Sequence, residues 1–190
     1  MLADTSFSMG THIDVLFARD ATLSIDALNT RLNDTFAQLQ PDLDILAATA
    51  FHSRNTGTWD LSHVPRDGSE PEYIFAEGPH GFDVSIYTNV ATLGSPFRFQ
   101  HLHDPDSRVA RPLQNLVHYV AQNLSGNPTF IAVAGGMGDS DHVLDHVYYD
   151  NGDIESAVQL LVEQHGAPCS SWDDLNRDSS GWLFHDSRVR

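Results

Sequence analysis

Two different periodic patterns of hydrophobic and polar residues occur in the first seventy residues. Residues 11–18 have a mixed alternating pattern that predicts a strand. Apolar residues then recur at spacings of three and four over residues 25–39, which predicts an amphipathic helix. Residues 43–51 are apolar and fit either a helix or a strand. Residues 52–71 carry glycines and prolines among polar residues, and they predict a long loop.

The middle of the chain contains the clearest hairpin pattern. Residues 72–77 and 82–92 are rich in aromatic and β-branched residues, and the Gly-Pro-His-Gly segment at 78–81 is turn-forming. A second helix is predicted from about residue 107 to residue 124, again from spacings of three and four. Residues 129–134 predict a strand that is apolar enough to be buried on both faces.

The last third is less regular. Residues 139–145 predict one or two helical turns, and residues 146–149 (His-Val-Tyr-Tyr) predict a short strand. Asp153 is a suitable N-cap for a strong helix over residues 154–165. The apolar run at 182–184 is expected to dock on the core.

Without residues 43–71, the predicted order through residue 134 is strand, helix, strand, strand, helix, strand. This order is typical of a ferredoxin-like β-α-β-β-α-β fold. We therefore expect a single α+β domain over residues 1–190. Its core would be a ferredoxin-like sandwich over residues 1–134, and residues 135–190 would form a helix-containing C-terminal extension packed on that core.

Composition excludes several classes of chemistry. All ten basic residues are arginine, so the absence of lysine rules out a phosphate-loop lysine and a Schiff base. Cys169 is the only cysteine, which rules out an intrachain disulfide and a Cys-rich zinc site. The sequence has neither a secretory signal pattern nor an apolar run of about 20 residues. We expect a soluble, cytoplasmic protein that does not bind membranes.

The formal net charge of −16 argues against nucleic-acid binding, which depends on Lys and Arg contacts to phosphates. Between Arg111 and Arg177 there is no arginine but there are nine acids. Two interpretations stay open. The acids provide a well-solvated or salt-adapted surface, or they form a surface that captures a basic protein partner.

The second interpretation predicts a non-enzymatic binding module without a cofactor. Acids would steer a cationic partner, and interspersed aromatic residues would supply buried contacts. The predicted partner-binding residues are Asp139, Asp141, Asp145, Tyr148, Tyr149, Asp150, Asp153, Glu155, Trp172, Asp173 and Asp174. Small acidic α+β immunity proteins inhibit basic nuclease toxins in this way. The likeness to them is one of size, charge and architecture.

An alternative is a metal-dependent hydrolase or metal-binding protein that holds a divalent ion such as zinc. The residues His101 and His103 would share one side of an extended segment, and His142 and His146 would share one face of a helix. Nearby aspartates would add oxygen ligands. The same residues also fit turns and helix caps, and no named metal signature is present.

Overall fold

The computed structural model describes residues 12–20, 22–38, 59–65, 67–68, 72–78, 82–94, 108, 110–125, 129–135, 140–172 and 183–189. These residues form an α+β architecture with a seven-stranded antiparallel sheet in the order β2-β3-β4-β5-β1-β6-β7. The strands are β1 (His12–Ala18), β2 (Asp60–Val64), β3 (Tyr73–Glu77), β4 (Asp83–Ile86), β5 (Val90–Gly94), β6 (Ile131–Gly135) and β7 (Leu183–Asp186). The helices are α1 (Ile25–Gln38), α4 (Ala110–Ser125), α5 (Ser140–Tyr149) and α6 (Ile154–His165).

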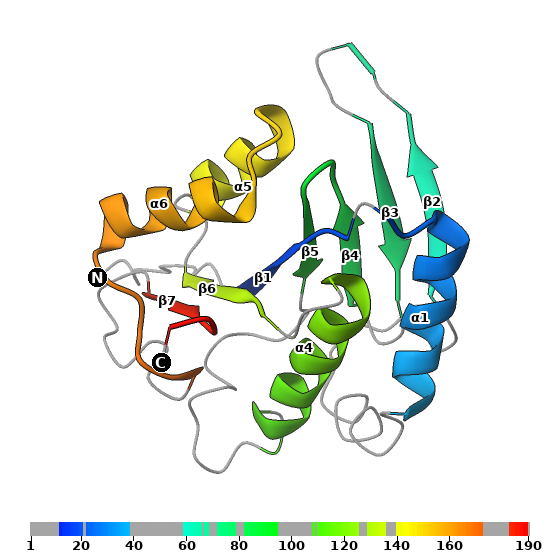
Figure 1. Cartoon of the computed structure of the whole chain (residues 1–190), viewed down its shortest axis with the longest axis horizontal. Helices are drawn as coiled ribbons and strands as arrows, with labels where there is room; N and C mark the ends of the chain where they lie inside the picture. Colours follow the sequence, from blue (N-terminus) through cyan, green and yellow to red (C-terminus); the bar gives the residue numbers. More distant parts are fainter. Residues whose placement is uncertain are drawn as a thin grey trace, which may run out of the picture.

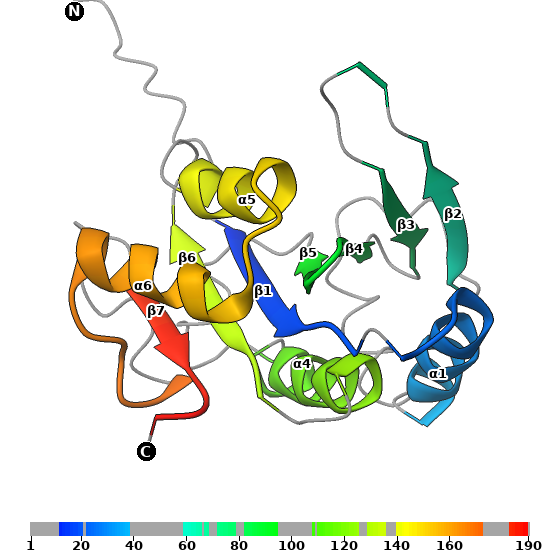
Figure 2. The same ribbon diagram turned by 45° about the horizontal axis from the view of Figure 1, so that its top comes forward.

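The sheet lies between two helical layers (Figures 1 and 2). Helices α1 and α4 pack together over one face, and α5 and α6 cover part of the other. Successive residues of a strand point to opposite faces, so the central strand β1 contributes to both cores. Val15 and Phe17 belong to the core under α1 and α4, and Leu16 belongs to the core under α5 and α6.

The first core confirms the predicted helical stripe of α4. Leu113, Leu116, Val117 and Val120 are all buried, as their spacing requires. They pack in one cluster with buried residues of α1, of which Leu32 is fully buried. Helix α1 begins at the predicted residue and ends one residue earlier, and the bounds of α4 and β6 differ from the predicted ones by one to three residues at each end.

The second core contains α6, whose bounds match the prediction. Ala157 and Leu161 are its buried residues. Asp153 is its N-cap: its carboxylate accepts a hydrogen bond of 2.8 Å from the backbone N–H of Ser156, and the Ser156 hydroxyl accepts one from Asp153 N–H. This reciprocal arrangement is a capping box, and it explains why the helix begins where it does.

The predicted strand at residues 146–149 is wrong, because these residues complete α5. Valine and tyrosine favour strands, and this local preference suggested the error. Val143 and Val147 are both buried in the second core. Residues four apart share a face of a helix, so burying both valines requires the helical conformation.

The predicted loop over residues 52–71 contains β2, which forms an edge of the sheet. This strand pairs with β3 in antiparallel register from Asp60↔Glu77 to Val64↔Tyr73. Leu61 packs partly on the first core, whereas Ser62 and His63 are exposed. An edge strand that buries so little resembles a polar loop in sequence.

The predicted single strand over residues 82–92 is two strands, β4 and β5. They are joined by a tight turn closed by a 2.9 Å hydrogen bond from Tyr87 N–H to the Val90 carbonyl. The polar residues Thr88 and Asn89 interrupt the apolar pattern at this turn, and the prediction overlooked them. The turn places β5 between β4 and β1.

The strand order does not confirm the ferredoxin-like topology. β5 separates β4 from β1, and β2 and β7 extend the two edges of the sheet. Residues 135–190 contribute β7 and the second helical layer, so they share in the sheet and in one of its cores. Among the described residues, no helix has the length and apolarity needed to cross a lipid bilayer.

Candidate functional site

A cleft of about 360 Å³ lies between α5 and the adjoining face of the sheet. Three aspartates and four tyrosines dominate its wall, and two hydroxyl residues, a glycine and a leucine complete it. The lining residues are Asp14, Tyr73, Asp83, Ser85, Tyr87, Thr92, Gly94, Leu144, Asp145, Tyr148 and Tyr149. No arginine or histidine is among these described lining residues, so the cleft presents a negative surface.

Cross-strand register brings the carboxylates of the cleft floor together. Gly94 of β5 pairs with Asp14 of β1 on one side and with Asp83 of β4 on the other. A Cβ atom built on Gly94 would lie 2.6 Å from Asp83 Oδ1. The missing side chain of Gly94 therefore leaves the space into which the Asp83 carboxyl group turns.

This crowding of acids affects the protonation of Asp83. Burial raises the pKa of its carboxyl group, and the carboxylates of Asp14 and of Glu77 on β3 raise it further. Each cause disfavours the negative charge of Asp83 in the folded protein. A cation in the cleft would relieve both the desolvation and the repulsion.

The next row of the floor consists of hydroxyl groups. Thr92 and Ser85 pair across β5 and β4, and they are only 8% and 9% exposed. Hydrogen bonding from their side chains would favour the ionised phenol of Tyr87 and lower its pKa. Burial raises the pKa of Tyr87 although these hydrogen bonds oppose the shift, so the phenol stays neutral near pH 7.

The tyrosines form a contiguous aromatic wall at one end of the cleft. The ring centroids of Tyr73 and Tyr87 are 5.5 Å apart, and the ring of Tyr148 on α5 lies 5.6 and 5.5 Å from them, nearly perpendicular to both. Tyr149 extends the cluster outward, 4.6 Å from Tyr148 and 50% exposed. Aromatic faces attract cations, so this wall complements the acidic floor.

The position of α5 over the sheet is fixed by its C-terminal connection. Asn151 has the left-handed φ of 54° that often ends a helix. The Thr88 hydroxyl donates to Asn151 Oδ1 at 2.9 Å, and the Asn89 side chain donates to the Asn151 carbonyl at 2.8 Å. The β4–β5 turn is thereby tied to α5, which holds the two walls of the cleft together.

His146 belongs to this same connection. Its Nε2 lies 2.9 Å from Ser156 Oγ at the start of α6, and its Nδ1 lies 3.2 Å from Asp150 Oδ2. A Cβ atom on Gly152 would lie 2.4 Å from the His146 ring, so only glycine fits beneath it. Both ring nitrogens have protein partners, which favours a structural role over the metal-ligand role of the alternative hypothesis.

A second hollow, of about 500 Å³, lies between α5 and α6. Asp145 and Tyr149 line both this hollow and the cleft. Asp150, His146, Leu160 and Gln164 complete the lining of the second hollow. We refer to Asp145, Tyr149 and Asp150 as the α5 ridge, because they lie along the helix end between or beside the two hollows.

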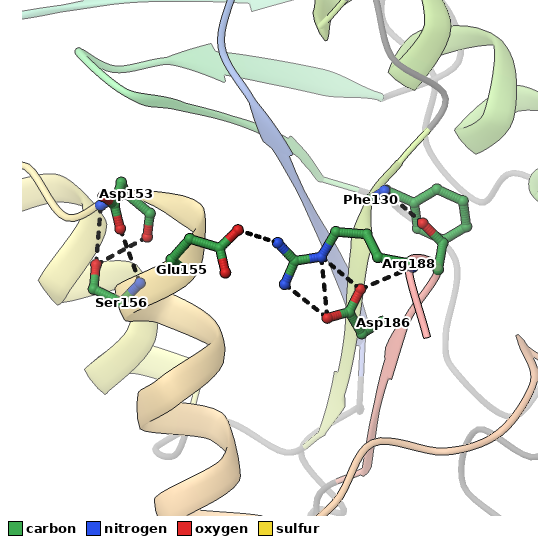
Figure 3. A network of polar contacts seen from close by, with 7 residues as sticks. Phe130, Asp153, Glu155, Ser156, Asp186 and Arg188 are labelled. Atoms are coloured by element: carbon green, nitrogen blue, oxygen red, sulfur yellow. Dashed lines mark hydrogen bonds and ion pairs between the residues drawn. The ribbon is translucent and has the colours of Figure 1, made fainter. Parts of the chain in front are cut away.

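Two of the predicted partner-binding acids, Asp153 and Glu155, have structural contacts at the start of α6. Asp153 caps the helix, and Glu155 forms an ion pair with Arg188 (Figure 3). Arg188 also holds Asp186 with a 2.7 Å contact from Nη2 to Oδ2. Burial opposes the ionisation of Asp186, but the Arg188 hydrogen bonds outweigh it and keep the pKa of Asp186 below its usual value.

The structure brings together only part of the predicted set. Asp145, Tyr148 and Tyr149 line the cleft, and Asp150 lies at the second hollow. Trp172 is partly buried against the first core, with its ring centroid 5.9 Å from that of Phe130. The predicted residues Asp139, Asp173, Asp174, His101 and His103, and the side chains of Asp141 and His142, lie outside the described part of the chain.

Sequence reasoning missed the sheet side of the cleft. Asp14 lies on β1, far in sequence from Tyr73 on β3 and from Asp83 and Tyr87 on and after β4, and strand pairing through β5 brings them together. One signal was present. Asp14 interrupts the otherwise apolar strand β1 on the same face as the buried Leu16, and a carboxylate in such a position needs a specific reason.

The described carboxylates and imidazoles do not form a metal centre. Within the ranges given above, no three His, Cys, Asp or Glu side chains converge as metal coordination requires. The two histidine pairs of the alternative hypothesis include side chains outside those ranges, so that hypothesis is neither supported nor excluded by this finding.

Comparisons of the chain with protein-family models, with curated proteins and with solved structures found no match.

Proposed function

We propose that this protein is a non-enzymatic binding module that captures a basic protein partner through the cleft and the α5 ridge. The observation that carries the proposal is the cleft itself, whose described lining combines three aspartates and four tyrosines without a basic residue. Carboxylates steer a cationic partner and aromatic rings provide buried contact area. The net charge of −16 would accelerate the encounter.

The proposed binding surface continues beyond the cleft. Two hollows flank α5, and the half-exposed Tyr149 lies between them. Tyrosine is enriched among residues that dominate binding energy at protein interfaces. A small molecule would fill one hollow, whereas a protein surface would cover both hollows and the ridge.

A more specific form of this proposal, the finer version, is that the protein is an immunity-type inhibitor of a nuclease. A nuclease binds phosphates in a basic cleft, and an acidic protein that occupies this cleft would block the substrate. The activity of a captured nuclease, measured with and without this protein, tests the finer version separately.

The test uses a photo-crosslinking residue at Tyr149, with Gln122, an exposed residue of α4 in the other helical layer, as the control position. In cells of the native host, we expect a basic protein to be crosslinked at position 149 and not at 122. The association rate of the purified pair should fall steeply with salt. Asp145→Asn should lower that rate by about threefold at low ionic strength.

Three outcomes would overturn the proposal. These are crosslinking that does not differ between positions 149 and 122, a captured partner that is acidic, and an association rate that neither salt nor Asp145→Asn changes.

A further inference from the structure

The floor of the cleft has a shape that selects among cations. Asp14 and Asp83 lie on the two strands that pair with β5 at Gly94, and the Asp83 carboxyl group turns into the space over Gly94. Two carboxylates that face one cleft in this way suit a broad cation with several N–H donors. A guanidinium group has five N–H donors in a fixed planar arrangement, whereas an ammonium group is a compact point charge.

The aromatic wall also favours a planar cation over a compact one. Tyr73, Tyr87 and Tyr148 lie within 5.6 Å of one another by ring centroid, directly beside the carboxylates. Guanidinium groups stack on aromatic faces and are more weakly hydrated than ammonium groups. The cleft volume of about 360 Å³ is at the small end of the range of ligand pockets, roughly 300–1,000 Å³.

A bare metal ion fits this arrangement less well. No three carboxylates or imidazoles among the described residues converge closely enough for coordination. The carboxylates are instead spread across strands β1 and β4 and helix α5. Carboxylates on three separate elements can each contact a different part of an organic cation.

We propose that the cleft binds the guanidinium group of one arginine side chain of the basic partner, with Asp14 and Asp83 contacting its charge and the tyrosine rings packing on its plane. This assignment rests on the proposed function, because the arginine belongs to a protein that also covers the α5 ridge. The raised pKa of Asp83 supports it independently, since a bound cation would restore the ionised carboxylate.

The first test titrates the isotope-labelled protein with N-acetyl-arginine amide and N-acetyl-lysine amide at matched ionic strength. We expect saturable NMR shifts at the amides of Thr92, Gly94 and Tyr148, with a Kd in about the millimolar range. The lysine compound should bind at least about threefold more weakly. Magnesium chloride serves as the probe for a divalent metal ion and should give no saturable shift at these amides.

Variants separate loss of binding from loss of structure. Asp83→Asn should weaken arginine amide binding at least about tenfold without lowering the Tm, since it removes a disfavoured charge. Asp34→Asn, the same change at an exposed site on α1, should bind as the wild type does. Gly94→Ala keeps the net charge but displaces the Asp83 carboxyl group, and it should also weaken binding.

Equal affinity for both amides, no saturable shift with arginine amide, or full binding by Asp83→Asn would each overturn the guanidinium site. If the crosslinked partner still binds through Asp145, the proposed function stands and only this inference fails. In the partner, replacing one arginine by lysine should weaken binding to the wild type more than to Asp83→Asn. If no arginine of the partner shows this difference between the wild type and Asp83→Asn, while free arginine amide still binds, the ligand is a small molecule and the partner assignment is wrong.

Discussion

Asp83 shows how one residue links the function of the cleft to the stability of the protein. Its carboxyl group is half-buried and lies beside the carboxylates of Asp14 and Glu77. Asp145 on α5 and the phenol of Tyr87 face the same cleft, and neither is cationic. An acid in this environment makes the unliganded fold less stable, and a ligand that needs its charge would account for its presence there.

The loss of stability that the Asp83 carboxylate causes should depend on pH. In the folded protein the pKa of Asp83 is raised above 3.8, the usual value for an aspartate side chain. Between the two pKa values the folded state binds more protons than the unfolded state, so the free energy of unfolding falls as pH rises through this window. Asp83→Asn should therefore stabilise the protein at about pH 8 and have little effect near pH 4.

Urea denaturation of both proteins across this pH range measures the difference. Asp34→Asn is the control, because its carboxylate is exposed on α1. A stability gain from Asp83→Asn that is the same at both ends of the range would contradict the assigned cause.

At the scale of elements, the α5–α6 corner determines the geometry of the site. The ring of His146 lies over Gly152 and contacts Ser156 in the capping box of α6. Asn151, next to Gly152, holds the β4–β5 turn. A change in this corner would therefore move one wall of the cleft relative to the other.

Gly152→Ala tests this corner. The new Cβ atom would overlap the His146 ring, so we expect a loss of about 1–3 kcal/mol in the free energy of unfolding. The double variant His146→Ala/Gly152→Ala should lose less than the sum of the two single variants, because the overlap is then absent. Chemical denaturation measures all three, and strict additivity would show that the two residues do not interact as described.

Sequence predicted the elements whose signals are local and missed those that depend on distant pairing. Helix α6 combines a capping residue with a regular apolar stripe, so its bounds were predicted correctly. Helix α5 is short and rich in valine and tyrosine, and only the burial of Val143 with Val147 reveals its helical conformation. Asp145 and Tyr149 were predicted as site residues because acids and aromatics are adjacent in sequence, whereas Asp83 reaches the site through strand register.

At the scale of the whole molecule, the dominant property is the unbalanced charge. Twenty-six acids and ten arginines give a net charge of −16, and this excess repels itself in the compact state. In the part of the chain that the structure describes, Arg188 pairs with Glu155 and Asp186, and ten arginines cannot neutralise twenty-six acids. The thermal stability of the folded protein should therefore depend on the ionic strength of the solution.

We predict that raising sodium chloride from about 0.01 M to about 0.5 M increases the Tm, because salt shortens the range of repulsion between exposed charges. A relief of about 1 kcal/mol corresponds to a rise of about 2–4 °C for a chain of this size. Calorimetry measures the shift, with sucrose as an uncharged control for excluded-solute effects. A Tm that falls or stays constant would mean that the acids are already compensated within the fold.

The order of the strands also has a consequence for biosynthesis. β1 pairs with β5 and β6, which the ribosome makes much later, and the outer edge of β6 is covered by β7 at residues 183–186. The nascent chain must therefore carry an apolar central strand, and then an open sheet edge, through much of translation. Early contact with a chaperone, before β6 emerges, would protect this strand from pairing with another chain.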